Sequence, residues 1–556
     1  MGFSGSPNCG ILIAACTTRG YFCPPPEKRP KKECGTLTAE TFPIMSRNEI
    51  ARPDVWHGAS RLRAKEFLQS EETLKLRAPG EKMNRLLLML SLSFITFHPS
   101  GLMLGQENKS DQYQMLVGTW TGVVNAGAMK FTLVFKFRED EKKTVRGTMD
   151  ILEQDAKDLP IQDIVLRGDS LILDLPSIQR KYAGRVMDDR KVIEGNYIRY
   201  GTIALPLTLQ KVDSEVVLNR PQTPRPPYPY KEESVLFQNE KEGVTLAGTL
   251  DLPKDKDPAP ALVFISGSGA QDRDETAFGH KPFLVLADYL ARRGIASLRF
   301  DDRGVGGSSG DHFQSTTKRN AEDVLSAIRY LKSRKEIDSR NMGLLGHSEG
   351  CVIATIAASR FPELRFIVAL GAPGVSIEEN LYLQNTLIRK AEGASDVQIE
   401  QYGALQKKIF SEIKESKNDS LTTEKLRALY SFGLYQALPQ NQKQLIDARI
   451  RDVLTPYFRD ILSYDPRPDL LQVKVPFLAL TGEKDLQAPP DPNLRALEKA
   501  LKDGGNTHVT ILRIPGLNHM LQVCRTGTMA EYSTIEETIA PQVLEAIHRW
   551  IVDHLQ

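Results

Sequence analysis

The chain has 556 residues, of which 41% are hydrophobic and 26% are charged, and its formal net charge is +2. At roughly one domain per 150 residues, this length predicts about two to four domains, and the apolar fraction is sufficient for real cores. The balanced charge argues against a nucleic-acid partner. The chain also lacks the acidic excess that is typical of disordered proteins.

Residues 1–82 have the composition of a segment without a folded core. They contain Pro24-Pro25-Pro26 and scattered basic residues, and their apolar residues follow neither the period of a strand nor that of a helix. Four of the six cysteines lie here without the closely spaced pairs of a zinc site: Cys9, Cys16, Cys23 and Cys34. We predict no metal site and interpret residues 1–82 as a non-native or disordered extension.

Residues 83–105 have the three parts of a secretory signal peptide. Met83-Asn84-Arg85 is a positively charged start, Leu86–Phe97 is an apolar run, and Gly105 is a small residue at a plausible cleavage site. The apolar run is shorter than the roughly 20 residues that span a bilayer, so no stable membrane anchor is expected. We predict that translation starts at Met83 and that the protein is exported, to the periplasm or out of the cell.

Residues 112–213 show a short, alternating hydrophobic pattern that recurs about every ten residues, which is typical of an all-β barrel or sandwich. The opening Gly118-x-Trp120 is similar to that of small ligand-holding barrels, although a tryptophan in a first strand more often belongs to the core. Residues 214–232 follow as a stiff, extended linker, because they are rich in proline from Pro221 to Pro229.

Residues 233–556 change to an alternation of apolar strands and helical stretches. This alternation predicts a doubly wound α/β domain with a mostly parallel sheet, in which ligands bind beyond the carboxyl ends of the strands. Strands are expected at 235–252 (a hairpin), 262–265, 296–300, 343–345, 366–370, 475–481 and 509–514, and helices at 282–293, 321–332, 350–359, 494–501 and 535–555.

Residues 376–465 interrupt that alternation with long helical segments at 377–391, 396–417 and 423–438. We interpret them as a helical cap inserted between two strands, which would roof the site and shape the substrate pocket. The alternative is a plain structural insertion.

The motif Gly346-His347-Ser348-Glu349-Gly350 lies between the apolar run 342–345 and the small-residue helical run 351–359. A Gly-x-Ser-x-Gly turn between a strand and a helix holds its serine in a strained geometry at the top of a sheet. Ser348 is therefore the predicted nucleophile, and the alternative is an ordinary turn whose serine caps the helix. Cys351 is expected to be a buried thiol, and neither it nor Cys524 requires a disulfide.

Two loops after later strands supply the partners that a serine nucleophile needs. The hydroxyl needs an imidazole to take its proton, and the imidazole needs a carboxylate to fix its tautomer and stabilise its cation. Asp485 and His519 fill these roles, and the chain order Ser348, Asp485, His519 is that of one hydrolase fold. Glu483 competes with Asp485, which is preferred because it lies further along the loop. His347 is expected to support the site by packing.

The oxyanion of an acyl-transfer intermediate also needs N–H donors. The backbone N–H of Glu349, directly after the nucleophile, is one candidate. The loop after the strand at 262–265 should supply the other, from Ser268 or, as second choice, from Gly269. This loop is not a dinucleotide fingerprint, because Asp272 occupies its third glycine position, and no cofactor is predicted.

Four segments together resemble the α/β-hydrolase superfamily, and most closely its bacterial EstD-type carboxylesterases and serine aminopeptidase-like (S33) hydrolases: 266–275, 300–306, 346–350 and 482–485. The resemblance covers about residues 231–556 and implies an exported two-domain esterase with a serine triad and no metal. Relatives often carry a glycine where Cys351 stands. Asp272, Arg273 and Asp274 would either order the oxyanion loop through ion pairs or form an exposed charged turn.

These observations predict a serine hydrolase that cleaves small-molecule acyl esters through a Ser-His-Asp acyl-enzyme mechanism. A peptidase with the same triad is an alternative, and it would need an acidic anchor for a substrate amine in the cap, such as Glu378 or Glu379. A further alternative is a binding protein whose hydrolase domain is inert.

Overall fold

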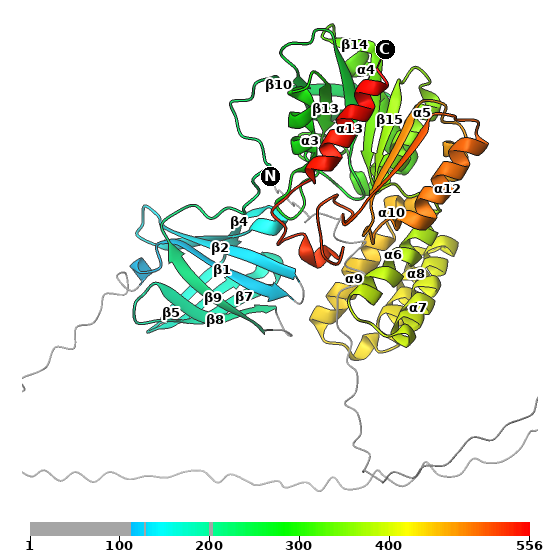
Figure 1. Ribbon diagram of the computed structural model, residues 1–556. Coiled ribbons are helices and arrows are strands. Elements are labelled where there is room, and N and C mark those ends of the chain that lie inside the picture. Colours follow the sequence, from blue (N-terminus) through cyan, green and yellow to red (C-terminus); the bar gives the residue numbers. More distant parts are fainter. Residues whose placement is uncertain (1–112, 127–128, 200–203, 556) are drawn as a thin grey trace, which may run out of the picture. The chain divides into compact units, whose positions relative to one another are not determined.

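The computed structural model describes residues 113–126, 129–199 and 204–555 (Figure 1). The predicted extension at 1–82, with its four cysteines, and the predicted signal peptide at 83–105 lie outside these ranges. Within the described ranges, no helix is both long and apolar enough to cross a bilayer.

The region predicted to be all-β, residues 112–213, is all-β where the structure describes it. Among the described residues, nine strands form a single antiparallel sheet in the order β4-β3-β2-β1-β9-β8-β7-β6-β5, rather than a two-sheet sandwich. Trp120 is fully buried, and its Nε1 donates to the Leu116 carbonyl at 2.7 Å, so this tryptophan is a core residue. The strands are β1 (Gly118–Ala126), β2 (Met129–Glu139), β3 (Val145–Ile151), β4 (Ala156–Ile161), β5 (Asp163–Arg167), β6 (Ser170–Leu175), β7 (Arg180–Val186), β8 (Val192–Arg199) and β9 (Ala204–Val212).

A second sheet contains eight of the described strands in the order β10-β11-β13-β12-β14-β15-β16-β17. The first two strands form the expected antiparallel hairpin, and the strands from β13 to β17 pair in parallel. The strands are β10 (Lys231–Asn239), β11 (Val244–Leu252), β12 (Ala259–Ile265), β13 (Ala296–Phe300), β14 (Ile337–His347), β15 (Phe366–Leu370), β16 (Phe477–Gly482) and β17 (Val509–Ile514).

Helices cover both faces of this second sheet. One face packs against α3 and α13 through residues such as Phe283 and Trp550. The other packs against α4, α5 and α12. Because both faces are buried, the central strands are continuous apolar runs, and this arrangement is the predicted α/β class. The helices are α3 (Pro282–Ala291), α4 (Thr317–Lys332), α5 (Glu349–Arg360), α12 (Pro490–Asp503) and α13 (Pro541–Asp553).

Six helices lie between β15 and β16, in the interval where the sequence predicts a helical insertion. Apolar residues of this insertion, such as Phe410, Ile450 and Tyr457, belong to the same core as one face of the sheet. The insertion is therefore packed on the α/β core. Its helices are α6 (Ile377–Ala391), α7 (Asp396–Glu415), α8 (Asp419–Tyr430), α9 (Gln440–Val453), α10 (Pro456–Leu462) and α11 (Arg467–Leu470).

Two predicted helices differ most from their limits in the structure. The helix expected at 423–438 ends at Tyr430, because Phe432 and Gly433 have φ angles of 52° and 81°, in a left-handed region that a helix cannot continue through. The helix expected at 535–555 begins at Pro541, because the preceding Ala540 N–H is bonded to the Leu521 carbonyl instead.

Candidate active site

Ser348 lies in the turn between β14 and α5, at the carboxyl end of the strand. Its φ and ψ are 53° and −120°, an unusual conformation for a residue with a side chain. The Ser348 N–H donates to the Leu370 carbonyl at 2.8 Å, which ties the turn to β15. This strained strand-turn-helix geometry is what a Gly-x-Ser-x-Gly elbow requires. The serine side chain makes no capping hydrogen bond to α5, so the helix-cap alternative is not supported.

The two glycines of the motif are required because backbones approach closely on both sides of Ser348. A Cβ on Gly346 would lie 2.5 Å from the carbonyl of Gly350. A Cβ on Gly350 would lie 2.1 Å from the Ile265 carbonyl oxygen and 2.6 Å from that of Ser266. The elbow therefore fits only when these positions carry no side chain.

We expect Gly350→Ala to lower the free energy of unfolding by more than about 4 kcal/mol, because backbone atoms of β12 and the following loop would have to move. The matched control is Gly403→Ala in α7, where an added Cβ meets nothing within 4 Å. That change should stabilise the protein by about 0.5 to 1 kcal/mol, because alanine favours a helix more than glycine does. Denaturant unfolding measures both, and equal effects would contradict the close approach at Gly350.

His519 and Asp485 are paired, as the sequence predicts, at the ends of β17 and β16. The distance from His519 Nδ1 to Asp485 Oδ2 is 2.8 Å, and the two side chains are 4% and 0% exposed. Asp485 Oδ1 accepts hydrogen bonds from the N–H groups of Gln487 and Ala488, both at 2.8 Å. These bonds fix the carboxylate so that its other oxygen faces the imidazole.

Glu483, the competing carboxylate, does not pair with His519. Glu483 is exposed, and its Oε2 accepts from the Gly516 N–H at 3.2 Å. The preference for Asp485 therefore agrees with the geometry.

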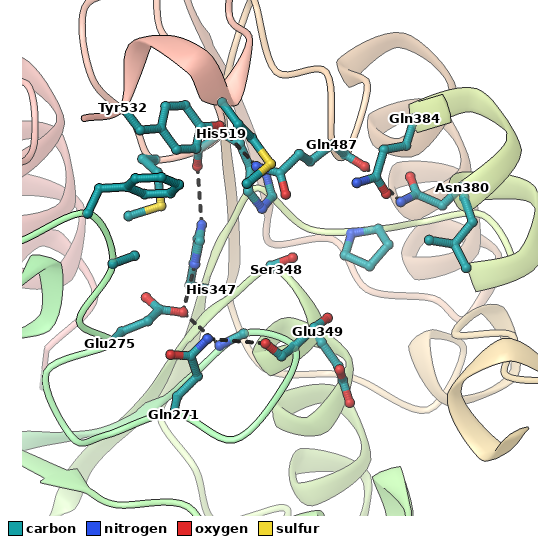
Figure 2. Close-up of a pocket in the computed structure, with 18 of the residues that line it drawn as sticks. Gln271, Glu275, His347, Ser348, Glu349, Asn380, Gln384, Gln487, His519 and Tyr532 are labelled. Carbon is teal, nitrogen blue, oxygen red and sulfur yellow. Dashed lines mark hydrogen bonds and ion pairs between the residues drawn. The ribbon is translucent and has the colours of Figure 1, made fainter. Parts of the chain in front are cut away.

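His347 and Glu275 form a buried pair in the wall of the candidate site (Figure 2). His347 Nδ1 lies 2.9 Å from Glu275 Oε1, and His347 Nε2 lies 3.2 Å from the His519 carbonyl oxygen. Burial lowers the pKa of His347, but the adjacent Glu275 carboxylate more than offsets it, and the net shift is upward. His347 thus supports the backbone of His519. Sequence reasoning missed Glu275, because nothing in its local pattern distinguishes it from other acidic turn residues.

The loop after β12 leaves one N–H free between two that are used. The Gly267 N–H donates to Glu275 Oε1 at 2.7 Å, and the Gly269 N–H donates to the Tyr457 hydroxyl at 3.0 Å. Within the described part of the chain, the Ser268 N–H has no hydrogen-bond acceptor. Of the two predicted donors in this loop, Ser268 is therefore free and Gly269 is not. The Glu349 N–H is the first of α5 and belongs to the group without an intrahelical acceptor.

The charged turn at Asp272, Arg273 and Asp274 is ordered by ion pairs, one of the two predicted possibilities. Arg273 binds Asp301 through two of its nitrogens, at 3.0 and 2.7 Å. Asp274 pairs with the buried Arg299 and with Lys281. The turn formed by Asp272, Arg273 and Asp274 is therefore attached to the sheet.

Asp302, at the end of β13, holds the loop from a third side. Its Oδ1 accepts from the Ser266 hydroxyl at 2.8 Å, and its Oδ2 accepts from the Gln271 N–H at 3.0 Å. Burial holds the pKa of this carboxyl well above its usual range.

The side chain of Glu349 is turned into the protein. It is buried, its Oε2 accepts a hydrogen bond from the Tyr457 hydroxyl, and its Oε1 has no hydrogen-bond partner. Burial raises the pKa of Glu349 to about 7, while the Tyr457 and Ser268 hydroxyls act in the opposite direction.

Ser348 and His519 line one pocket, together with Ser268 and Glu349 (Figure 2). Further walls come from α6, α10 and the loops after β12, β15, β16 and β17, and they include apolar residues: Phe278, Pro373, Ile377, Leu381, Phe458, Ile461, Met520, Met529 and Tyr532. The fold thus brings the predicted serine, histidine and donor residues to a single cavity, with Asp485 directly behind the histidine.

Glu378 and Glu379, the predicted amine anchors of a peptidase, do not line this pocket. Glu378 is instead paired with Lys414 and accepts a hydrogen bond from the Tyr382 hydroxyl at 2.8 Å.

Among the described residues, Cys351 and Cys524 are free thiols, and Cys351 is buried. Burial raises the pKa of the Cys351 thiol, which disfavours its thiolate. In the part of the chain that the structure covers, no group of His, Cys, Asp and Glu has the arrangement of a metal site.

A mostly parallel sheet with a strained serine at a strand-helix turn, and with a histidine and a carboxylate after later strands, is the arrangement typical of α/β-hydrolases. The comparisons agree with this class. Residues 281–523 match the family model described as serine aminopeptidase, S33. This match agrees with the predicted resemblance to serine aminopeptidase-like (S33) hydrolases over residues 281–523.

Among curated proteins, the chain is similar to esterase EstD of Thermotoga maritima, with 27% identity over 309 residues, 55% of this chain and 65% of that esterase. It is also 24% identical to polyketide transferase claH of Penicillium crustosum over 27% of this chain and 47% of the transferase. Among solved structures, the Pyrococcus furiosus esterase Pf2001 covers 62% of this chain and 100% of its own, with 14% identity and a TM-score of 0.38.

Proposed function

We propose that the protein is a carboxylesterase-type serine hydrolase that cleaves small-molecule acyl esters through Ser348, His519 and Asp485. The observation that carries the proposal is the buried His519–Asp485 pair, which lies at the same cavity as a serine held in a strained elbow. A buried imidazole fixed by a carboxylate is the arrangement that serves as a general base for a hydroxyl nucleophile.

In the first half of the reaction, Ser348 Oγ attacks the acyl carbonyl carbon while His519 Nε2 takes the hydroxyl proton. Asp485 Oδ2 accepts a hydrogen bond from the Nδ1–H group, so it selects the tautomer with a free Nε2 and stabilises the imidazolium. The carbonyl oxygen becomes an oxyanion, which accepts hydrogen bonds from the N–H groups of Ser268 and Glu349.

When the tetrahedral intermediate collapses, the ester C–O bond breaks and His519 gives its proton to the leaving alcohol. A water then attacks the acyl-Ser348 carbonyl with His519 as base again, and the acid is released. Every step uses groups of this chain, so the mechanism needs no metal or cofactor.

The helical insertion acts as a cap in this proposal, because α6 and α10 contribute pocket walls through Leu381 and Ile461. The walls contributed by residues 233–555 contain no Lys or Arg, and their two carboxylates, Glu275 and Glu349, are hydrogen-bonded within the protein. Such walls favour an uncharged substrate with apolar groups.

Gln384 of α6 adds one polar preference. Gln384 lines the pocket and is 6% exposed. An amide can both donate and accept hydrogen bonds, so Gln384 favours a substrate that carries a polar group beside its apolar part.

Two measurements test the proposal. A fluorophosphonate probe should label the folded protein on the peptide that contains Ser348, because such probes react with an activated serine. Rates on p-nitrophenyl esters of graded length should exceed rates on aminoacyl anilides. A folded protein without labelling would support an inert binding protein, and faster cleavage of anilides would support the peptidase.

We also propose that the protein is exported through a signal peptide that starts at Met83. The proposal is supported by the sequence pattern of residues 83–105 alone. N-terminal sequencing of the mature protein should give a chain that begins near Gln106, and a mature chain that begins well before this residue would contradict it.

A further inference from the structure

Tyr457 of α10 makes an unusual contact between the helical insertion and the oxyanion loop. Its hydroxyl accepts from the Gly269 N–H at 3.0 Å and donates to Glu349 Oε2. Gly269 directly follows Ser268, the first predicted oxyanion donor, and Glu349 is the residue whose backbone N–H is the second. One phenol oxygen therefore links both sides of the predicted oxyanion hole.

We infer that Tyr457 is a positioning residue, which sets the Ser268 N–H for catalysis by holding Gly269 against the carboxyl of Glu349. The inference rests on the proposed function. Tyr457 and Glu349 are both buried, so each would lose a partner that water cannot replace if this link were broken.

The other attachments of the loop show why this link matters. Glu275 holds Gly267, and Asp302 holds Ser266 and Gln271. These attachments come from the α/β domain and lie on either side of Ser268 and Gly269. Within the described residues, the Gly269 N–H has Tyr457 as its acceptor. The insertion would thus complete the hole as well as cover it, which makes the donor geometry depend on the insertion being seated.

The groups around the Tyr457–Glu349 hydrogen bond favour a fixed position of the Tyr457 side chain. The pKa of Glu349 is affected by Asp460 of α10, by the Ser268 hydroxyl and by Tyr457. The ring of Tyr457 packs against that of His312, with 4.5 Å between centroids, and both nitrogens of His312 are buried without a hydrogen-bond partner. Burial lowers the pKa of His312 to about 4, so this histidine is neutral near pH 7 and does not compete for the carboxylate.

The test compares Tyr457→Phe with Tyr382→Phe. Both changes remove a hydrogen bond from a tyrosine of the insertion to a glutamate, but Tyr382 bonds Glu378 and does not touch the oxyanion loop. Phenylalanine keeps the ring packing in each case. For ester hydrolysis, Tyr457→Phe should lower kcat about 10- to 100-fold and leave KM within about threefold, because donor alignment matters most in the transition state. Tyr382→Phe should leave both constants near the wild-type values.

A second variant breaks the same link from its other end. Glu349→Leu removes the carboxyl but keeps the backbone N–H, and it should also lower kcat rather than raise KM. The double variant should lose no more than the worse single variant, because both changes disrupt one unit. Additive losses in the double variant would overturn the inference.

Amide hydrogen exchange tests the link without any turnover. Exchange in residues 265–271 should be faster in Tyr457→Phe than in the wild type and in Tyr382→Phe. Unchanged exchange, or an effect confined to KM, would overturn the inference while ester hydrolysis by the wild type still supported the proposed function. A wild type without esterase activity would contradict that function, and the exchange result would still decide whether Tyr457 holds the loop.

Discussion

Ser348→Ala is expected to lower kcat for ester hydrolysis by about 10⁵- to 10⁶-fold, because it removes the atom that forms the acyl-enzyme. The variant should keep the strained φ of 53° at residue 348 as the wild type does, since alanine is no bulkier than serine. The loss should therefore appear in kcat with little change in the midpoint of thermal unfolding. Steady-state kinetics and a thermal melt of the same preparation measure both quantities.

Ser359→Ala is the matched control for this experiment. Ser359 lies at the other end of α5, is partly buried, and donates to the Ile356 carbonyl at 2.8 Å. Its replacement should change kcat less than twofold. If Ser348→Ala kept more than about a hundredth of the wild-type kcat, Ser348 would not be the nucleophile, and another hydroxyl would have to be sought.

Asp485→Asn is expected to lower kcat by about 10⁴-fold through the tautomer of His519. Gln487 and Ala488 direct their N–H groups at Asp485 Oδ1, so the asparagine oxygen should take that side. The amide NH2 would then face His519 Nδ1 and donate to it. The imidazole would then carry its proton on Nε2, and this nitrogen could not accept the proton of Ser348.

Glu483→Gln supplies the matched control, because it makes the same chemical change two residues away. Glu483 is exposed and contacts the Gly516 N–H rather than the imidazole, so kcat should stay within about twofold of the wild type. A large loss in Glu483→Gln combined with a small loss in Asp485→Asn would reverse the assignment of the carboxylate.

Several elements could be predicted because their signals are local. The strand at 296–300 and the helix at 377–391 have the predicted limits, since each has a clear hydrophobic period and clear end signals. The prediction of a helix at 423–438 was wrong in its second half. The left-handed φ at Phe432 comes from how the turn is packed, and no residue type there announces it.

The candidate site divides in the same way. Ser348, Asp485 and His519 could be selected because a parallel sheet brings the ends of its strands to one edge, so their positions after strands were enough. Glu275 and Tyr457 could not be selected. Glu275 lies in a turn among other acidic residues, and Tyr457 lies in an insertion whose seating on the core has no periodic signal.

The sequence by itself determined the order of strands and helices and the elbow with its two glycines, because these depend on residues a few positions apart. It also determined which serine, carboxylate and histidine follow which strand. Only the tertiary structure decided which loop N–H stays free and which groups hold its neighbours. Gly269 and Tyr457 are 188 residues apart, and a hydrogen bond across that separation exists only when the insertion packs on the sheet.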